Sequence, residues 1–270
     1  YVVDKATKLE TIYNRIHEIR MRFEVLRRDA EIRLLRESGC DREISPGRRQ
    51  AYEEEVRGLE NDFAFVAACN QGGGFQTEAD RRRLSDIAGR TWQRHFSDRL
   101  GISAEELRAK QSAPEPDLPV PEPLLCDRPE HLVSRAKCYS DVRDVHGNPL
   151  NIPASEYNRG ELYNLSIARG TLTPEERFKI NEHTLSGLEM LRKIPFPEAF
   201  GRVTEIAAGH HETLDGTGYP LKKSKAELPV EARIMAIADI FEALTAADRP
   251  YKKAKTVSEA IEEEEEDGPQ

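Results

Sequence analysis

Apolar residues recur at alternating steps of three and four in two segments of the N-terminal part of the chain. The first series is Leu9, Ile12, Ile16, Ile19, Phe23, Leu26 and Ala30, and the second is Tyr52, Val56, Leu59, Phe63 and Val66. This spacing places an apolar stripe along each of two helices. Residues 38–47, between the two series, contain the glycines and the proline that interrupt helices. The pattern predicts an antiparallel helical hairpin, a coiled coil through which two chains dimerise, or both.

A proline-rich segment divides the chain. Residues 112–123 read S-A-P-E-P-D-L-P-V-P-E-P, and proline at this density excludes helix and favours an extended linker. We therefore expect a helical, coiled-coil-like dimerisation or signalling region over residues 1–110, with a helix over 77–110, and a linker over 111–124. A second domain is expected over 125–261, followed by an acidic tail over 262–270.

The composition excludes several classes of protein. Charged residues make up 33% of the chain and apolar residues 38%, as in a helix-rich soluble protein. No apolar run reaches the ~20 residues of a membrane-spanning helix. The net charge of −9 offers no basic surface for a nucleic acid polymer, and four scattered cysteines indicate reduced thiols. We expect a cytoplasmic protein, or the cytoplasmic part of a membrane-anchored sensor whose upstream segment lies outside this sequence.

The second half of the chain is predicted to be helical. Residues 173–176, T-P-E-E, match a capping box with proline at the first helical position, which predicts a helix to about residue 193. Further helices are expected over residues 198–212 and 231–247. No segment alternates apolar and polar residues in the manner of a strand, so the predicted class is all-α.

Two of the candidate chemical residues lie on predicted helices. His183 shares a helix face with Ile180 and Leu188 and is expected to point inward; alone it is explained as an ordinary core histidine. Asp239 lies within the apolar run R-I-M-A-I-A-D-I-F-E-A-L. A buried carboxylate costs several kcal/mol unless it is paired, so we expect Asp239 to contact a metal or a cation such as Arg249.

Two adjacent histidines occur in residues 209–220, G-H-H-E-T-L-D-G-T-G-Y-P. Neighbouring helix residues diverge by about 100°, so His210 and His211 are expected to reach two metals, or a metal and a substrate. Together with His183 and Asp239 they form a coordination set suited to Fe, Mn or Zn.

Three blocks of this sequence resemble the HD-GYP family. They are L-T-P-E-E-R-F-K-I-N-E-H at 172–183, H-H-E-x-x-D-G-x-G-Y-P at 210–220, and R-I-M-A-I-A-D-I-F-E-A-L-T-A-A-D-R-P-Y-K-K at 233–253. The resemblance covers about residues 161–259. It implies an HD-type helical bundle and a metal-dependent phosphodiesterase that hydrolyses cyclic di-GMP or a related cyclic dinucleotide.

The resemblance also implies individual roles. The implied metal ligands are His183, His210, His211 and Asp239, the last three acting in catalysis on one or two divalent ions, Fe or Mn. The implied substrate contacts are Gly218, Tyr219, Arg249 and Lys252, with the two cationic side chains on phosphate. The implied mechanism is attack on phosphorus by a metal-activated hydroxide.

One family motif, H-D-x-G-K-x-x-I-P, is absent, and the chain contains no His-Asp dipeptide. The nearest sequence is V-H-G-N-P-L-N-I-P at 145–153, which keeps only His146 of the catalytic positions. The leading hypothesis is therefore a phosphodiesterase with a reduced or rearranged metal site behind a helical, homodimeric N-terminal region. The alternatives are a degenerate domain that binds a nucleotide or a partner protein without hydrolysis, and a coiled-coil scaffold with a vestigial enzyme.

Overall fold

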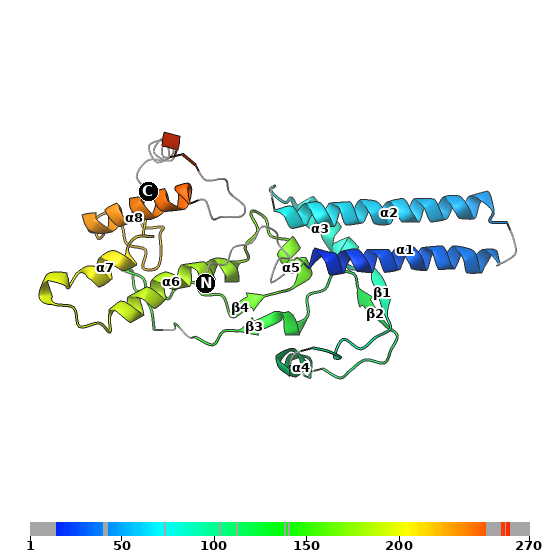
Figure 1. The fold of residues 1–270 in the computed structure, drawn as a ribbon, viewed down its shortest axis with the longest axis horizontal. Coiled ribbons are helices and arrows are strands. Elements are labelled where there is room, and N and C mark those ends of the chain that lie inside the picture. Colours follow the sequence, from blue (N-terminus) through cyan, green and yellow to red (C-terminus); the bar gives the residue numbers. More distant parts are fainter. Residues whose placement is uncertain are drawn as a thin grey trace. The chain divides into compact units, whose positions relative to one another are not determined.

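A computed structural model of the chain is largely helical (Figure 1). The residues that it describes are 15–39, 43–72, 74–102, 104–111, 113–137, 139, 141–246, 255–256 and 258–259. They form two compact units. The hairpin unit comprises the described part of Asp4–Ser134 together with Ser155–Thr173, and the C-terminal unit comprises the described parts of Arg135–Ala154 and Pro174–Gln270. The all-α class is confirmed; the domain boundaries placed at the proline-rich segment stay a prediction.

The predicted helical hairpin is confirmed by α1 (Ile16–Ser38) and α2 (Pro46–Gln71), which lie side by side in Figure 1. Their facing residues belong to the two apolar series. Ile19 and Val66 are fully buried, and the rings of Phe23 and Phe63 meet edge to face with centroids 5.4 Å apart. Leu9 and Ile12, the first members of the first series, lie outside the described residues.

The helix expected over residues 77–110 is wrong in its middle. The chain forms α3 (Glu78–Ala88), β1 (Thr91–Arg94) and α4 (Ala104–Lys110). Gly89 follows the last residue of α3, where glycine weakens a helix. β1 pairs antiparallel with β2 (Val120–Pro123), which is the end of the proline-rich segment. Two prolines are tolerated in β2 because a two-stranded sheet leaves one edge of each strand unpaired.

The expectation that the chain has no strands is therefore also wrong. A second antiparallel pair joins β3 (Leu132–Ser134) to β4 (Ser155–Asn158). Short strands of three or four residues contain too few side chains for alternation to be recognised in sequence. The remaining elements of the hairpin unit are η1 (Pro129–His131) and α5 (Glu161–Leu165).

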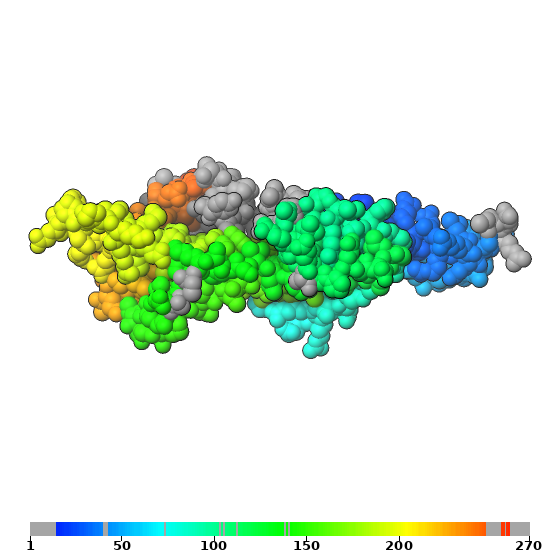
Figure 2. Space-filling view, turned by 90° about the horizontal axis from the view of Figure 1, so that it is seen from below, coloured from blue at the N-terminus to red at the C-terminus, as the bar shows by residue number. Residues whose placement is uncertain are grey.

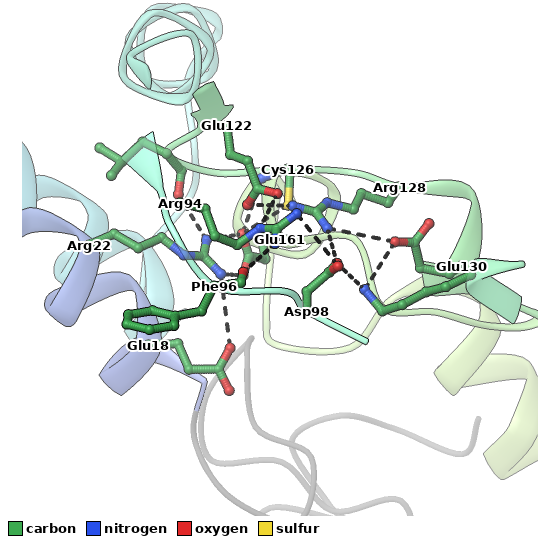
Figure 3. A network of polar contacts seen from close by, with 12 residues as sticks. Glu18, Arg22, Arg94, Phe96, Asp98, Glu122, Cys126, Arg128, Glu130 and Glu161 are labelled. Carbon is green, nitrogen blue, oxygen red and sulfur yellow. Dashed lines mark hydrogen bonds and ion pairs between the residues drawn. The ribbon is translucent and has the colours of Figure 1, made fainter. Parts of the chain in front are cut away.

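A buried ion pair fixes α5 to α1 within the hairpin unit (Figure 3). The guanidinium of Arg22 donates to both carboxylate oxygens of Glu161 at 2.7 and 3.0 Å and to the carbonyl of Leu124 at 2.9 Å. The backbone N–H of Cys126 donates to the same carboxylate at 3.1 Å. Burial by itself would raise the pKa of the Glu161 carboxyl. The hydrogen bonds and the positive charge of Arg22 have the larger combined effect and lower it. The pair therefore links segments far apart in the sequence.

The C-terminal unit is built on α6 (Pro174–Leu191), η2 (Glu198–Phe200), α7 (Val203–Ala208) and α8 (Val230–Thr245). α6 begins at the proline of the predicted capping box. α7 packs against both α6 and α8, and Figure 2 shows its yellow atoms beside the orange atoms of α8. The helix expected over 198–212 is shorter, because α7 ends at Ala208 before Gly209. Within the described residues, none of the helices is both long and apolar enough to cross a membrane.

Candidate metal centre

The C-terminal unit brings three histidines together. His183 lies on α6, and His210 and His211 lie in the turn that follows α7. One ring nitrogen from each lies within 4.8 Å of those of the other two. The expectation that His210 and His211 reach two metals, or a metal and a substrate, assumed that both lie on a helix, and they do not. Because the helix has ended at Ala208, the two imidazoles lie side by side with centroids 4.2 Å apart.

Backbone carbonyls orient two of the three imidazoles. The Nδ1 atom of His183 lies 2.6 Å from the carbonyl oxygen of Ile180, and Nδ1 of His210 lies 2.6 Å from that of Ala207. A carbonyl oxygen only accepts hydrogen bonds, so each Nδ1 is the protonated nitrogen and donates. The Nε2 lone pair of each ring therefore stays available for a metal, in the tautomer that metal-binding histidines commonly use.

The third imidazole is held by Tyr219. The phenol ring stacks on His211 with centroids 4.8 Å apart and an interplanar angle of 24°, and the backbone N–H of Tyr219 donates to the carbonyl of His211 at 3.1 Å. Burial, with a smaller contribution from the neighbouring His210, lowers the pKa of His211 to about 4. His211 is therefore a neutral imidazole, the form that binds metals.

Two of the predicted ligands are more exposed than expected. His183 was expected to point inward, but its side chain is exposed and faces the other two histidines. Asp239 was expected to be buried, but 47% of its side chain is exposed, and Oδ2 lies 4.0 Å from Nε2 of His211. Ala232 is the one residue of α8 that is fully covered. The apolar run around Asp239 therefore does not enclose it, and the burial argument for a metal at Asp239 was wrong.

Gly218 allows the loop after the histidines to fold back on itself. A Cβ atom at this position would lie 2.4 Å from the backbone nitrogen of Thr213 and 2.5 Å from Cα of Glu212. Both separations are far below contact distance, so no residue larger than glycine fits without moving the backbone. The structure thus gives a steric reason for glycine at this position, while the substrate contact implied for Gly218 stays a prediction.

Glu212 closes the same loop from the inside, a role that the sequence reasoning missed. Its carboxylate is buried and accepts hydrogen bonds from the backbone N–H groups of Leu221 at 2.6 Å and Lys223 at 2.9 Å. Burial raises the pKa of this carboxyl, while the two backbone bonds act in the opposite direction. A glutamate directly after the two histidines was the available signal.

Asp215 stabilises the tip of the loop. Its Oδ1 atom accepts hydrogen bonds from the hydroxyl of Thr213 at 2.6 Å and from the N–H and hydroxyl of Thr217 at 3.0 and 2.7 Å. These bonds lower the pKa of Asp215 to about 2. Gly216 lies between these groups with φ at +77°, a conformation that favours glycine. The acid therefore shapes the loop and does not join the histidine set.

Of the three remaining candidate residues, the structure describes only His146. Arg249 and Lys252 fall outside the described residues. His146 lies in an exposed turn and is not among the three clustered histidines. Its backbone N–H donates to the buried carboxylate of Asp144, which also accepts from Lys222 at 3.3 Å. The segment with His146 therefore packs against the loop that follows Tyr219 and supplies no ligand to the histidine set.

The separations within the histidine set are close to those between ligands of one metal ion. Metal–nitrogen bonds are about 2.0–2.1 Å, so two nitrogens on opposite sides of one ion are ~4.2 Å apart. The ring nitrogens of the three histidines lie within 4.8 Å of one another, so a small movement of the side chains would bring them to this separation or closer. Three imidazoles with a carboxylate nearby suit Fe, Mn or Zn better than Mg or Ca, which prefer oxygen ligands.

Parts of this sequence are similar to a known domain family and to known phosphodiesterases. The HD domain family matches residues 119–267. The chain is 41% identical over 94 residues to a cyclic di-GMP phosphodiesterase of Thermotoga maritima, covering 35% of this chain and 25% of that protein. It is 42% identical over 210 residues to the cyclic di-GMP phosphodiesterase response regulator RpfG of Xanthomonas campestris. These residues cover 77% of this chain and 43% of that protein.

A relative with a different named substrate is also similar. The 3'3'-cGAMP-specific phosphodiesterase 2 of Vibrio cholerae is 34% identical over 147 residues, which cover 52% of this chain and 26% of that protein. The matched parts of this chain thus span from 25% to 43% of the length of these three relatives.

Proposed function

Because this chain belongs to the HD domain family and carries an HD-GYP domain, we propose that it is a metal-dependent phosphodiesterase-type signalling module. Its substrate is cyclic di-GMP or a related cyclic dinucleotide, in keeping with the named activities of its relatives. The observation that carries this proposal is the set of three histidines beside the stacked ring of Tyr219. Both the ligands and the aromatic contact come from the blocks of sequence that resemble the family.

We propose that His183, His210 and His211 hold one ion through a ring nitrogen each, with Asp239 beside them. A bound Fe or Mn ion lowers the pKa of a water ligand and neutralises charge on a phosphate. The carbonyls of Ile180 and Ala207 hold two of the rings in the required tautomer. We propose that the exposed carboxylate of Asp239, whose Oδ2 lies 4.0 Å from Nε2 of His211, is a further ligand of this ion.

The same loop supplies contacts for the substrate. We propose that Tyr219, which is only partly buried and stacks on His211, presents its aromatic ring to a nucleobase. Gly218 keeps the backbone compact at this point. We propose that Arg249 and Lys252, which lie outside the described residues, bind the phosphates, as their charges favour.

The proposal is tested by turnover. The chain is loaded with Fe or Mn, incubated separately with cyclic di-GMP and 3'3'-cGAMP, and the products are separated by chromatography. We expect hydrolysis of at least one nucleotide, its loss in His210→Ala, and unchanged hydrolysis in the matched control His146→Ala. Nucleotide binding without any turnover by the metal-loaded chain would overturn the phosphodiesterase and support the alternative of a non-catalytic receptor, which the missing His-Asp dipeptide keeps as the competing outcome.

We also propose that the chain forms a homodimer through its N-terminal helices in the cytoplasm. On α1, Met21 is 62% exposed, Ile32 43% and Leu35 51%. Their spacing of 11 and 3 residues places them on one face of the helix, away from the buried seam with α2. An exposed apolar stripe on a helix is a typical packing surface for a second helix.

The dimer is tested by light scattering coupled to size-exclusion chromatography. We expect a mass of twice 30.6 kDa for the unmodified chain and a shift toward 30.6 kDa for Leu35→Glu. Arg27→Glu, at an exposed position on another face of α1, is the control and keeps the dimer mass. A monomer mass for the unmodified chain would refute this part of the proposal.

A further inference from the structure

The C-terminal unit contains a cavity of about 250 Å³ that is separate from the histidine set. It lies between the end of α6, α7 and the loop after Tyr219. Apolar walls come from Leu188, Ala208 and Leu221. None of the three clustered histidines lines it, and neither does Tyr219. The cavity is therefore a second concave surface next to the proposed metal centre.

Most charged groups in the cavity wall are already paired. Glu205 accepts from Nζ of Lys223 at 3.0 Å, so these two charges balance each other. The carboxylate of Glu212 accepts the backbone N–H groups of Leu221 and Lys223. The charges of Glu205 and Lys223 therefore offset each other, and both oxygens of Glu212 already accept backbone donors, so neither carboxylate requires a donor from a ligand.

Arg192 is different. Its exposed guanidinium lines the cavity and makes neither a hydrogen bond nor an ion pair with any other residue that the structure describes. Arginine presents a planar set of N–H donors that matches a carboxylate. The wall thus combines an apolar surface with one available cation.

We propose that this cavity is a binding site for a small organic anion. The apolar body of the ligand packs against Leu188, Ala208 and Leu221, and its carboxylate pairs with Arg192. Pockets for drug-sized ligands occupy about 300–1,000 Å³, so 250 Å³ admits a fragment-sized molecule and excludes a whole cyclic dinucleotide. The site is thereby distinguished from the proposed substrate site by size as well as by position.

The cavity shares its wall with the turn that carries the histidines. Ala208, Gly209 and Glu212, which line the cavity, flank His210 and His211 in the sequence. A molecule in the cavity would therefore contact residues next to the histidines without contacting the histidines themselves. The proposal goes beyond the proposed function, since it depends on neither metal binding nor hydrolysis.

The test is a titration of the full chain, followed by NMR of its methyl groups. The probes are benzoate, its neutral analogue benzyl alcohol, and inorganic phosphate. We expect benzoate to shift the methyl signals of Leu188, Ala208 and Leu221 to saturation. Benzyl alcohol should bind with about tenfold lower affinity, because it cannot form the charge-assisted hydrogen bond. Phosphate, which has no apolar body, leaves these signals unchanged.

Two variants test whether Arg192 is the residue that binds the carboxylate of the ligand. Arg192→Gln is expected to weaken benzoate about tenfold, while Lys193→Gln, at the neighbouring exposed position outside the cavity wall, leaves the affinity unchanged. Both side chains are exposed, so both variants are expected to fold. Benzoate that shifts none of the cavity methyl signals, or that binds Arg192→Gln as tightly as the unmodified chain, would overturn the proposal.

Discussion

The phenol ring of Tyr219 lies stacked on the imidazole of His211, and the backbone N–H of the same tyrosine donates to the carbonyl of the same histidine. The two residues are thus joined both by their rings and by their backbones. The stack holds His211 in one orientation beside His183 and His210. An aromatic residue in the expected substrate position therefore also supports the proposed metal ligands.

Removing the ring is expected to weaken metal binding. Aromatic contacts of this kind contribute about 0.5–1.5 kcal/mol, so Tyr219→Ala should lower the affinity for Mn or Fe by roughly two- to twelvefold. Tyr219→Phe keeps the stacked ring and is the matched control, with metal affinity close to that of the unmodified chain. Calorimetric titration measures both. Equal metal affinity in the alanine variant and the unmodified chain would show that the stack does not position His211.

Two glycines in the C-terminal unit are expected to respond in opposite ways to alanine. At Gly218 the new methyl group would overlap the backbone of residues 212 and 213, and we expect Gly218→Ala to destabilise the fold by about 1–3 kcal/mol. At Gly187, within α6, no atom lies within 4 Å of the added Cβ, and Gly187→Ala should stabilise by about 0.5–1 kcal/mol. Urea unfolding of both variants checks this, and a Gly218→Ala chain as stable as the unmodified one would contradict the loop geometry.

The Arg22–Glu161 pair predicts part of the response to acid. Because the pKa of Glu161 is lowered in the folded state, its contribution to stability is complete above the unfolded pKa of about 4.3 and is lost as the pH falls through the folded value. The free energy of unfolding should therefore fall between pH 5 and pH 3. Glu161→Gln should cost about 3 kcal/mol at pH 7, since it leaves the buried Arg22 without its counter-charge.

The slope of the free energy of unfolding against pH distinguishes the contribution of Glu161 from that of the other carboxylates. Urea unfolding from pH 3 to pH 6 should give a shallower slope for Glu161→Gln than for the unmodified chain. Glu53→Gln, at an exposed position of α2, should keep the full slope. Identical slopes for all three proteins would mean that Glu161 carries no share of the acid sensitivity.

The helical hairpin and the start of α6 were predictable from sequence because each has a strong local signal. Apolar spacing determines which faces of α1 and α2 meet, and a capping box marks Pro174. The short strands were not predictable, since pairing between distant segments and not local composition creates them. β2 forms within a proline-rich segment only because β1 lies opposite to it.

The sequence identified three histidines that lie together in the fold, but not their geometry. The sequence blocks identified the three histidines that the fold brings together, yet the inward position of His183 and the burial of Asp239 were wrong. Helical periodicity shows which residues share a face, but not whether another element covers that face. The end of α7 at Ala208, which places His210 and His211 side by side, depends on the packing of the following loop around Glu212 and Gly218.

The metal content of purified protein tests the central claim most directly. The chain is purified without chelator, supplied with Fe, Mn or Zn, dialysed and analysed for elements alongside His183→Ala and His146→Ala. We expect about one ion per chain for the unmodified protein and for His146→Ala, and a loss of nearly all metal in His183→Ala. A His183→Ala chain that retains as much metal as the unmodified protein would show that the three histidines do not form the metal site.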